Sequence, residues 1–126
     1  SKKLMFKAKR MRKMMGGGMR QVGYMAAAGT YALDNHIDRL KHDHRRANHL
    51  ANSFKGLAFV EDIEPVVTNI ILIKLSASVS RDDIMDKLKA KGVLVVPLGP
   101  QVIRMVTHLE IDDNMVDRTI EVMHSI

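Results

Sequence analysis

The stretch that decides the fold spans residues 12–21, with the sequence Arg12-Lys13-Met14-Met15-Gly16-Gly17-Gly18-Met19-Arg20-Gln21. Three consecutive glycines separate two segments with helical patterns, and glycine adopts backbone angles that other residues avoid. A helix that opens at Met19 would present unpaired N–H groups and the positive end of its dipole beside the glycines. Because Lys13 and Arg20 add charge there, the pattern predicts a phosphate or carboxylate site. A flexible turn between two helices explains the same pattern, because the stretch lacks the endings and spacings of known nucleotide-binding loops.

The periodicity of apolar residues predicts the elements on either side of this stretch. Apolar residues recur at helical spacing over residues 3–15, and small residues line a second helix over 19–33. The cap pair Asp34-Asn35 predicts a third helix that runs to Phe54. The later segments alternate between strand and helix patterns: strands 57–63 and 69–75, a helix that begins after Ser80, strands 93–96 and 101–108, and a last helix capped by Asp112. Helices followed by ββαββα indicate an α+β fold with a small sheet covered by helices.

Composition limits the class of protein. The 126 residues are 46% hydrophobic and 27% charged, as in a globular protein of one modest domain. The absence of cysteine excludes disulfides and thiolate metal sites and suits a cytoplasmic location. No two histidines are three or four positions apart, so we expect no metal site. The longest apolar run, Ile70–Ile73, has the length of a strand, so we expect no contact with a membrane core.

Positive charge is concentrated at the N-terminus. Of the 20 basic residues, eight fall within the first 20 positions, where no acidic residue occurs. Three interpretations remain open: binding of nucleic acid or an anionic membrane, contact with an acidic partner or a phosphate, and a solvated helix face. Phe6 is the only aromatic residue in this block. The lack of further stacking side chains argues against nucleic acid.

The glycine stretch resembles the low-specificity L-threonine aldolases when it is taken together with four other parts of the sequence. These are Ala26–Leu33, Asp43-His44, Ala47 and Arg104–Glu110. Members of that family use pyridoxal 5′-phosphate (PLP) and have the aspartate-aminotransferase-like fold type I. The resemblance covers nearly the whole chain and corresponds to about the last third of such an enzyme. It implies that residues 35–126 form the C-terminal small domain, and that residues 1–34 link it to a large cofactor-binding domain.

Arg104 is the strongest candidate for a binding residue outside the glycine stretch. It interrupts the apolar strand Val102-Ile103-Arg104-Met105-Val106, and alternation places it on one face with Val102 and Val106. A half-buried arginine needs an anionic partner, and its planar guanidinium suits a carboxylate. A structural ion pair with a glutamate, or simple exposure at the edge of the sheet, explains the same arginine. The resemblance implies that Arg104 binds the α-carboxylate of the substrate.

The resemblance also implies roles around the cofactor. Lys13, the three glycines Gly16, Gly17 and Gly18, and Arg20 are expected near the cofactor phosphate, at a subunit interface. Thr107 and His108 are expected to support the strand end behind Arg104. The lysine that forms the Schiff base follows a serine in the family, but Ser1-Lys2-Lys3 lies too close to the glycines to match it. We therefore expect this lysine, and most PLP ligands, outside the present sequence.

The resemblance implies the C-terminal part of a PLP-dependent enzyme that cleaves L-threonine or L-allo-threonine to glycine and acetaldehyde. The resemblance further implies a homotetramer, built as a dimer of dimers, in the cytoplasm. Alone, the chain is expected to be inactive. Two alternatives remain: a PLP-dependent β-eliminating lyase that acts on another amino acid, and a nucleic-acid-binding module that uses the basic N-terminal helix. The resemblance favours neither nucleic acid nor a membrane as a partner.

Overall fold

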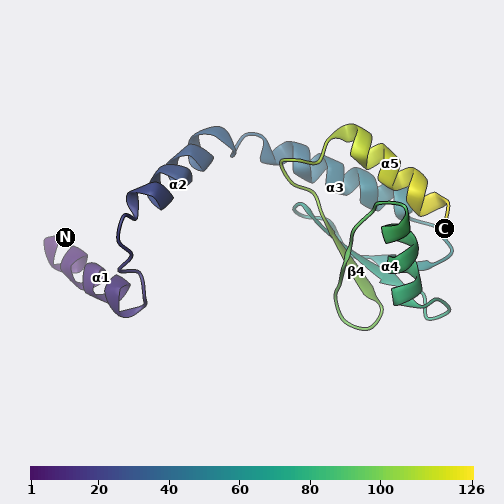
Figure 1. The fold of residues 1–126 in the computed structure, drawn as a ribbon, viewed down its shortest axis with the longest axis horizontal. Coiled ribbons are helices and arrows are strands. Elements are labelled where there is room, and N and C mark those ends of the chain that lie inside the picture. The colour runs from purple at the N-terminus through teal and green to yellow at the C-terminus, as the bar shows by residue number, and fades with distance from the viewer. The chain divides into compact units, whose positions relative to one another are not determined.

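The computed structural model describes residues 1–126, which form two compact units (Figure 1). The N-terminal unit is Ser1–Asp38 and the C-terminal unit is Arg39–Ile126. The sequence predicts a boundary after Asp34, and the structure divides after Asp38. The elements in chain order are α1 (Lys2–Met14), α2 (Gly23–Asn35), α3 (Leu40–Phe54), β1 (Val60–Ile63), β2 (Ile70–Leu75), α4 (Arg81–Ala90), β3 (Val96–Pro97), β4 (Val102–Val106) and α5 (Asp113–His124).

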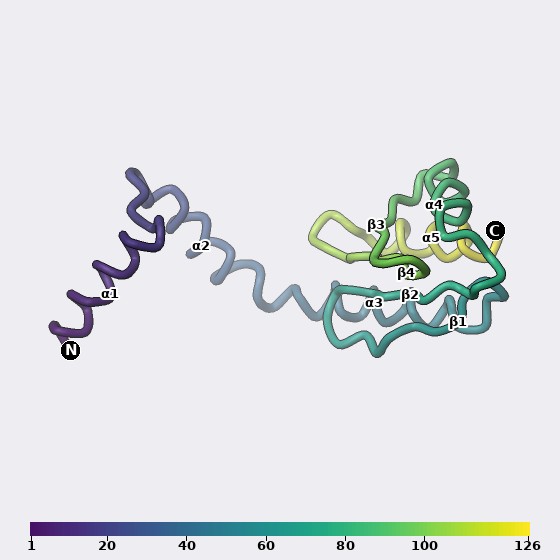
Figure 2. The backbone as a smooth tube through the Cα atoms, turned by 90° about the horizontal axis from the view of Figure 1, so that it is seen from below, coloured from purple at the N-terminus to yellow at the C-terminus, as the bar shows by residue number.

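The C-terminal unit contains one antiparallel sheet with the strand order β1-β2-β4-β3. The central strands β2 and β4 pair along their full length, from Ile70 opposite Val106 to Lys74 opposite Val102. They lie side by side in both backbone views (Figures 1 and 2). The edge strand β3 has two residues and pairs only with Ile103 and Arg104. The order of elements confirms the predicted α+β fold with its ββαββα arrangement.

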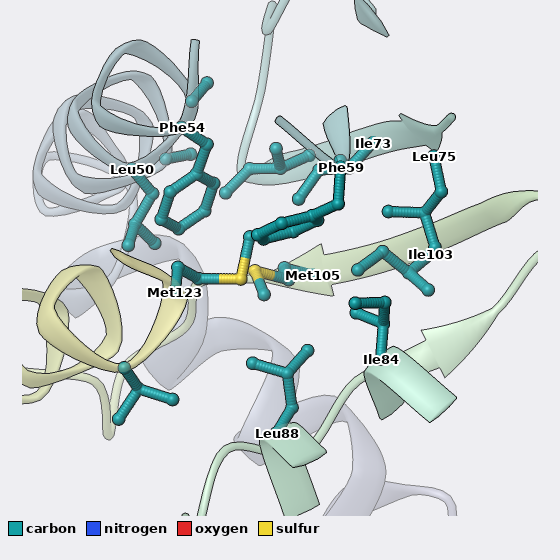
Figure 3. Close-up of a cluster of buried hydrophobic side chains, with 14 of the residues drawn as sticks. Leu50, Phe54, Phe59, Ile73, Leu75, Ile84, Leu88, Ile103, Met105 and Met123 are labelled. Carbon is teal, nitrogen blue, oxygen red and sulfur yellow. The ribbon is translucent and has the colours of Figure 1, made fainter. Parts of the chain in front are cut away.

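The core lies on one face of this sheet. Strand alternation directs Ile71, Ile73 and Ile103 to the same side, and each of the three is fully buried. All three helices of the unit bring apolar side chains to this face, including Phe54 of α3 and Leu88 of α4 (Figure 3). Since α3, α4 and α5 all pack on this side, no helix of the C-terminal unit covers the opposite face. We call that opposite side the open face of the sheet.

The N-terminal unit contains two helices that bury no residue. Ser1 caps α1, because its Oγ accepts a hydrogen bond from the Leu4 N–H at 3.3 Å. The helix ends at Met14, and the turn that follows contains Gly16, which has a φ of +82°. A side chain at Gly17 would meet the Arg12 carbonyl oxygen at 2.8 Å, so this tight turn requires glycine. None of the helices in the structure is both long and apolar enough to span a membrane.

Several predicted boundaries are wrong, among them the first strand, which begins at Val60 and not at residue 57. The second helix begins at Gly23 instead of Met19, because Gln21 has a φ of 50° and residues 20–22 form a turn. The third helix begins at Leu40. Its predicted cap, Asn35, instead ends α2 and donates its side-chain N–H to the Tyr31 carbonyl at 2.9 Å. The strand predicted over residues 93–96 is reduced to the two residues of β3.

Candidate functional site on the open face of the sheet

Arg104 lies in the middle of the open face. Its neighbours across the strands are Leu72 of β2 and Val96 of β3. The adjacent residues along β4, Ile103 and Met105, are buried on the core side. The predicted alternation of β4 is therefore confirmed, and the arginine projects from the side of the sheet that no helix of this unit covers.

The guanidinium of Arg104 has no anionic partner in the structure. Its Nε is buried and makes no hydrogen bond, and none of the ion pairs in the structure includes Arg104. The alternative of a structural pair with a glutamate is therefore not seen within this chain. Lys74 on the same face is paired with Glu61 at 2.5 Å, and this hydrogen bond raises the pKa of Lys74. A buried, unpaired N–H is costly, so the site is suited to an anion that supplies the missing acceptor.

The end of β4 behind Arg104 is held by Thr107, which is 2% exposed. Its Oγ1 donates to the main-chain carbonyl of Asp43 at 2.8 Å, which ties the strand end to α3. Its N–H donates to the Asn69 carbonyl at 3.0 Å, and its own carbonyl accepts from the Asn69 side chain at 2.6 Å. Helix α3, the residue before β2 and the end of β4 therefore meet at one hydrogen-bonded threonine.

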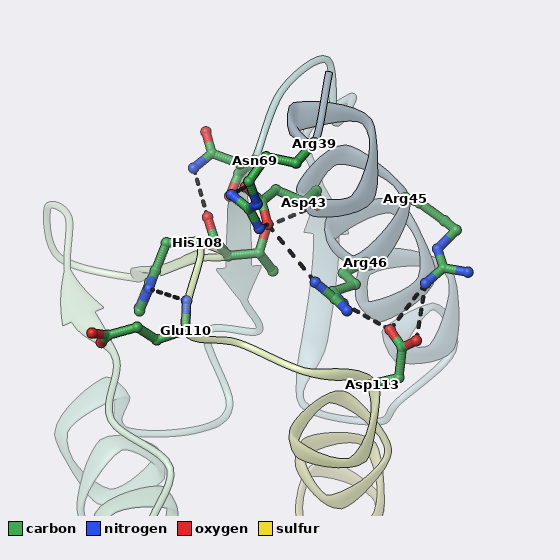
Figure 4. A network of polar contacts seen from close by, with 9 residues as sticks. Arg39, Asp43, Arg45, Arg46, Asn69, His108, Glu110 and Asp113 are labelled. Carbon is green, nitrogen blue, oxygen red and sulfur yellow. Dashed lines mark hydrogen bonds and ion pairs between the residues drawn. The ribbon is translucent and has the colours of Figure 1, made fainter. Parts of the chain in front are cut away.

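We call the hydrogen bonds of Thr107 to Asp43 and Asn69 the clamp. Asp43 links this clamp to a group of arginines (Figure 4). The carboxylate is buried, and Arg39 donates to both of its oxygens at 2.8 Å. Arg46 lies 4.0 Å from the same carboxylate and donates its Nε to Asp113 at 2.7 Å. Arg45 completes the group with two bonds of 3.0 Å to Asp113. The hydrogen bond from Arg46, together with the charge of Arg45, lowers the pKa of Asp113.

The role of Asp43 was missed from the sequence. Arg39 and Arg46 lie on a helix rich in charged residues, yet only 21% and 16% of their side chains are exposed. The available signal was their spacing, since residues three and four positions apart on a helix face each other. A basic residue on each side of Asp43 at these spacings indicates an ion-pair cluster.

His108 lies next to the clamp but makes little contact with it. The side chain is exposed, and its Nδ1 accepts a hydrogen bond from the Glu110 N–H at 3.4 Å (Figure 4). The structure therefore brings Thr107 and His108 to the end of the Arg104 strand, and only the threonine is fixed by several bonds. No cluster of three potential metal-binding side chains occurs.

The residues predicted around the glycine stretch belong to the N-terminal unit. Lys13, Arg20 and the three glycines are all exposed, and Gly16 has open space around it. Because α2 begins at Gly23, its unpaired N–H groups follow a turn and do not adjoin the glycines. The prediction of an anion site made by a helix start at Met19 is therefore wrong. The exposed charges of Lys13 and Arg20 remain candidates for an anionic partner.

Residues 1–78, more than half of the sequence, match the family of beta-eliminating lyases. The chain belongs to the beta-eliminating lyase family. The match includes the glycine stretch, α3 and both strands that precede α4.

Two relatives of this chain are named as threonine aldolases. It is 35% identical over 116 residues to the probable low-specificity L-threonine aldolase 2 of Arabidopsis thaliana. It is 36% identical over 105 residues to the low-specificity L-threonine aldolase of Escherichia coli K12. These matches cover 90% and 83% of the chain but 33% and 30% of the relatives. The chain therefore spans about a third of the length of these curated relatives.

A solved ornithine aminotransferase from Toxoplasma gondii has a similar fold. The TM-score is 0.61 at 20% identity, and the match covers 76% of this chain and 24% of that one. The chain therefore has the fold of part of a fold-type-I PLP enzyme, as the sequence predicts.

Proposed function

We propose that the complete protein is a PLP-dependent aldolase that cleaves L-threonine or L-allo-threonine to glycine and acetaldehyde. The observation that carries this proposal is Arg104, whose buried Nε has no acceptor within the chain. An amino-acid substrate brings a carboxylate that accepts two parallel hydrogen bonds from one guanidinium. Family membership and the two threonine aldolase relatives support the choice of reaction.

The residues of this chain fit a part of a PLP site. Arg104 fits the carboxylate of the substrate, because its orphaned Nε lies on a face that no helix of its unit covers. Lys13 and Arg20 carry exposed charges that suit the cofactor phosphate of a neighbouring subunit. We place the lysine that holds the cofactor outside this chain, so the chain alone would be inactive. The bound cofactor supplies the sink for the electrons of the broken bond.

The contribution of the chain is orientation of the substrate. Leu72 and Val96 flank Arg104, and such apolar neighbours keep water away and strengthen a charged hydrogen bond. Thr107 fixes the strand end three residues further on, which limits the movement of the guanidinium. A clamped carboxylate holds the substrate in one orientation, and orientation is a large part of rate enhancement. The proposed homotetramer and cytoplasmic location rest on the family resemblance and on the absence of cysteine.

A second candidate function is β-elimination from another amino acid, because the matched family is described as beta-eliminating lyases. Arg104 would bind the carboxylate in either reaction, so the products must discriminate. An aldolase releases acetaldehyde and glycine from L-threonine. A β-eliminating lyase releases ammonia from an amino acid that carries a leaving group on its β-carbon.

The test is substitution of Arg104 in the complete protein. Arg104→Ala is expected to weaken glycine binding about 100-fold, because a buried charge pair loses one partner. Affinity for PLP should change little, and Arg104→Lys should restore part of the glycine affinity. Lys74→Ala is the control, since Lys74 lies on the same face but is already paired with Glu61. Glycine titration, followed through the cofactor absorption band, measures these affinities. Equal affinity in Arg104→Ala and the unsubstituted protein would contradict the assignment.

A further inference from the structure

A pocket of about 430 Å³ opens beside the edge of the sheet in the C-terminal unit. It exists because β3 is short: β3 pairs with Ile103 and Arg104, while β4 continues to Val106 without a partner strand on that edge. The residues before β3, the end of β4 and the first turns of α5 line the space. All of these segments belong to the same compact unit.

The lining is mainly apolar, and its two titratable side chains are Arg118 and His108. Most lining side chains are aliphatic or methionine, and no carboxylate is among them. The hydroxyls of Thr107 and Thr119 are already bonded to the carbonyls of Asp43 and Met115, respectively. Arg118 also lines the pocket, and it takes part in none of the hydrogen bonds or ion pairs of the structure. The pocket therefore combines apolar walls with one exposed guanidinium, that of Arg118, which has no partner within the chain.

Three of the apolar lining residues are exposed. Leu94 is 78% exposed, Met115 is 50% exposed and Val106 is 40% exposed. When a ligand covers apolar side chains grouped around a cavity, the burial of their surface stabilises the complex. The volume lies within the range of small-molecule pockets, which are mainly apolar with a few polar groups that orient the ligand.

We propose that this pocket binds a small hydrophobic monocarboxylate, with its apolar chain against Leu94, Met115 and Val106 and its carboxylate on Arg118. One negative charge matches one unpaired guanidinium, and the aliphatic walls match an unbranched or aromatic hydrocarbon body. Arg104 does not line the pocket, so the proposed substrate site and this site use different arginines. The inference does not depend on the reaction that the complete protein catalyses.

The test uses the intact protein labelled with ¹³C at the methionine methyl groups, because Met105 and Met115 both line the pocket. Octanoate is titrated to about 10 mM, which would mostly fill a site with a Kd of about 1 mM. The signals of Met105 and Met115 should shift with saturation. The signals of Met5 and Met85, which lie outside the pocket, should stay in place. No saturable shift at Met105 and Met115 would overturn the proposal.

Two comparisons test the chemistry. Arg118→Gln should weaken octanoate about tenfold or more, because a charged hydrogen bond is lost, and should leave octanol binding unchanged. Lys89→Gln, on an exposed lysine outside the pocket, is the matched control. Butanoate should bind at least about tenfold more weakly than octanoate, since it buries less hydrocarbon.

Two results would overturn the proposal even if signals move. Equal octanoate affinity in Arg118→Gln and the unsubstituted protein would mean that the carboxylate does not bind Arg118. Shifts of Met105 and Met115 that follow protein concentration without octanoate would show that a second copy of the chain fills the pocket.

Discussion

The two units contain helices with similar amphipathic patterns but opposite degrees of burial. In α1, Leu4, Ala8 and Met11 share one helix face, as Ala47, Leu50 and Phe54 do in α3. Every residue of that set in α3 is buried, whereas none in α1 is. An apolar stripe predicts a helix but not its partner, and most helix stability in proteins comes from packing. The proposal that this chain is one third of a larger enzyme accounts for the bare stripe of α1.

The largest expected difference concerns two phenylalanines, one in each unit. Phe54 is fully buried and Phe6 is 72% exposed. Phe54→Ala is expected to lower the free energy of unfolding by about 3–5 kcal/mol, because it leaves a cavity in the core. Phe6→Ala should change it by less than about 0.5 kcal/mol, as at other exposed sites. Urea unfolding of the 126-residue chain, followed by circular dichroism, measures both values.

The outcome for Phe6 also tests the division into units. A loss of more than about 1 kcal/mol from Phe6→Ala would mean that α1 packs against something within the chain. In that case the contrast between the units would be wrong, and the apolar stripe of α1 would have its partner in this sequence.

A smaller difference is expected for two threonines that make the same kind of bond. Thr107 donates its hydroxyl to a carbonyl in a buried site, and Thr30 donates to the Ala26 carbonyl on an exposed helix. Thr107→Val is expected to cost about 1–2 kcal/mol, because the buried acceptor loses its donor. Thr30→Val should cost less than about 0.5 kcal/mol, since water replaces the bond. The urea midpoints of the two variants measure these losses, provided that the dependence of the unfolding free energy on urea concentration is unchanged.

Thr107→Ser is the control for the buried site, because it keeps the hydroxyl and removes only a methyl group. If Ser and Val at this position were equally destabilising, the loss would come from packing, and the hydrogen bond to Asp43 would not be the cause.

The sequence predicts the fold well where local pattern and packing agree. Ser80 and Asp112 were expected to cap helices, and both side chains accept from an N–H three residues on. The alternation of β4 predicts the inward side of Ile103 correctly. The sequence pattern predicts the wrong helix boundaries at Asn35 and Met19. Whether a residue caps a helix or extends it depends on single backbone angles, such as the φ of Gln21. No periodicity reports such an angle.

The candidate site was predictable in part, for a similar reason. Arg104 is conspicuous because it interrupts an apolar strand, and strand alternation alone assigns its face. Asp43 is less conspicuous, because an acid on an otherwise charged helix resembles a solvated residue. Its burial depends on the contact between α3 and Thr107, which is 64 residues away in sequence. Contacts over such separations are set by the tertiary fold, which the helical spacing of Arg39 and Arg46 cannot reveal.

The smallest expected effect is the pH dependence that Asp113 introduces. The hydrogen bond from Arg46, with the charges of Arg45 and Arg46, lowers the pKa of this exposed carboxyl below its ordinary value of 3.8. The stabilisation is therefore present above the unfolded-state pKa and is lost as the pH falls through the lower folded-state pKa. Asp113→Asn should unfold at lower urea than the unsubstituted chain at pH 7, and the difference should vanish near pH 2.

Asp34→Asn is the control, because Asp34 is an exposed carboxylate of the N-terminal unit that forms no ion pair. This substitution should leave the urea midpoint unchanged at pH 7. Because exposed pairs are screened, salt at about 1 M should also reduce the difference for Asp113 at pH 7. A difference that persists at pH 2 would instead come from the start of α5, where Asp113 is the first residue, because helix propensity does not require the carboxylate to be charged.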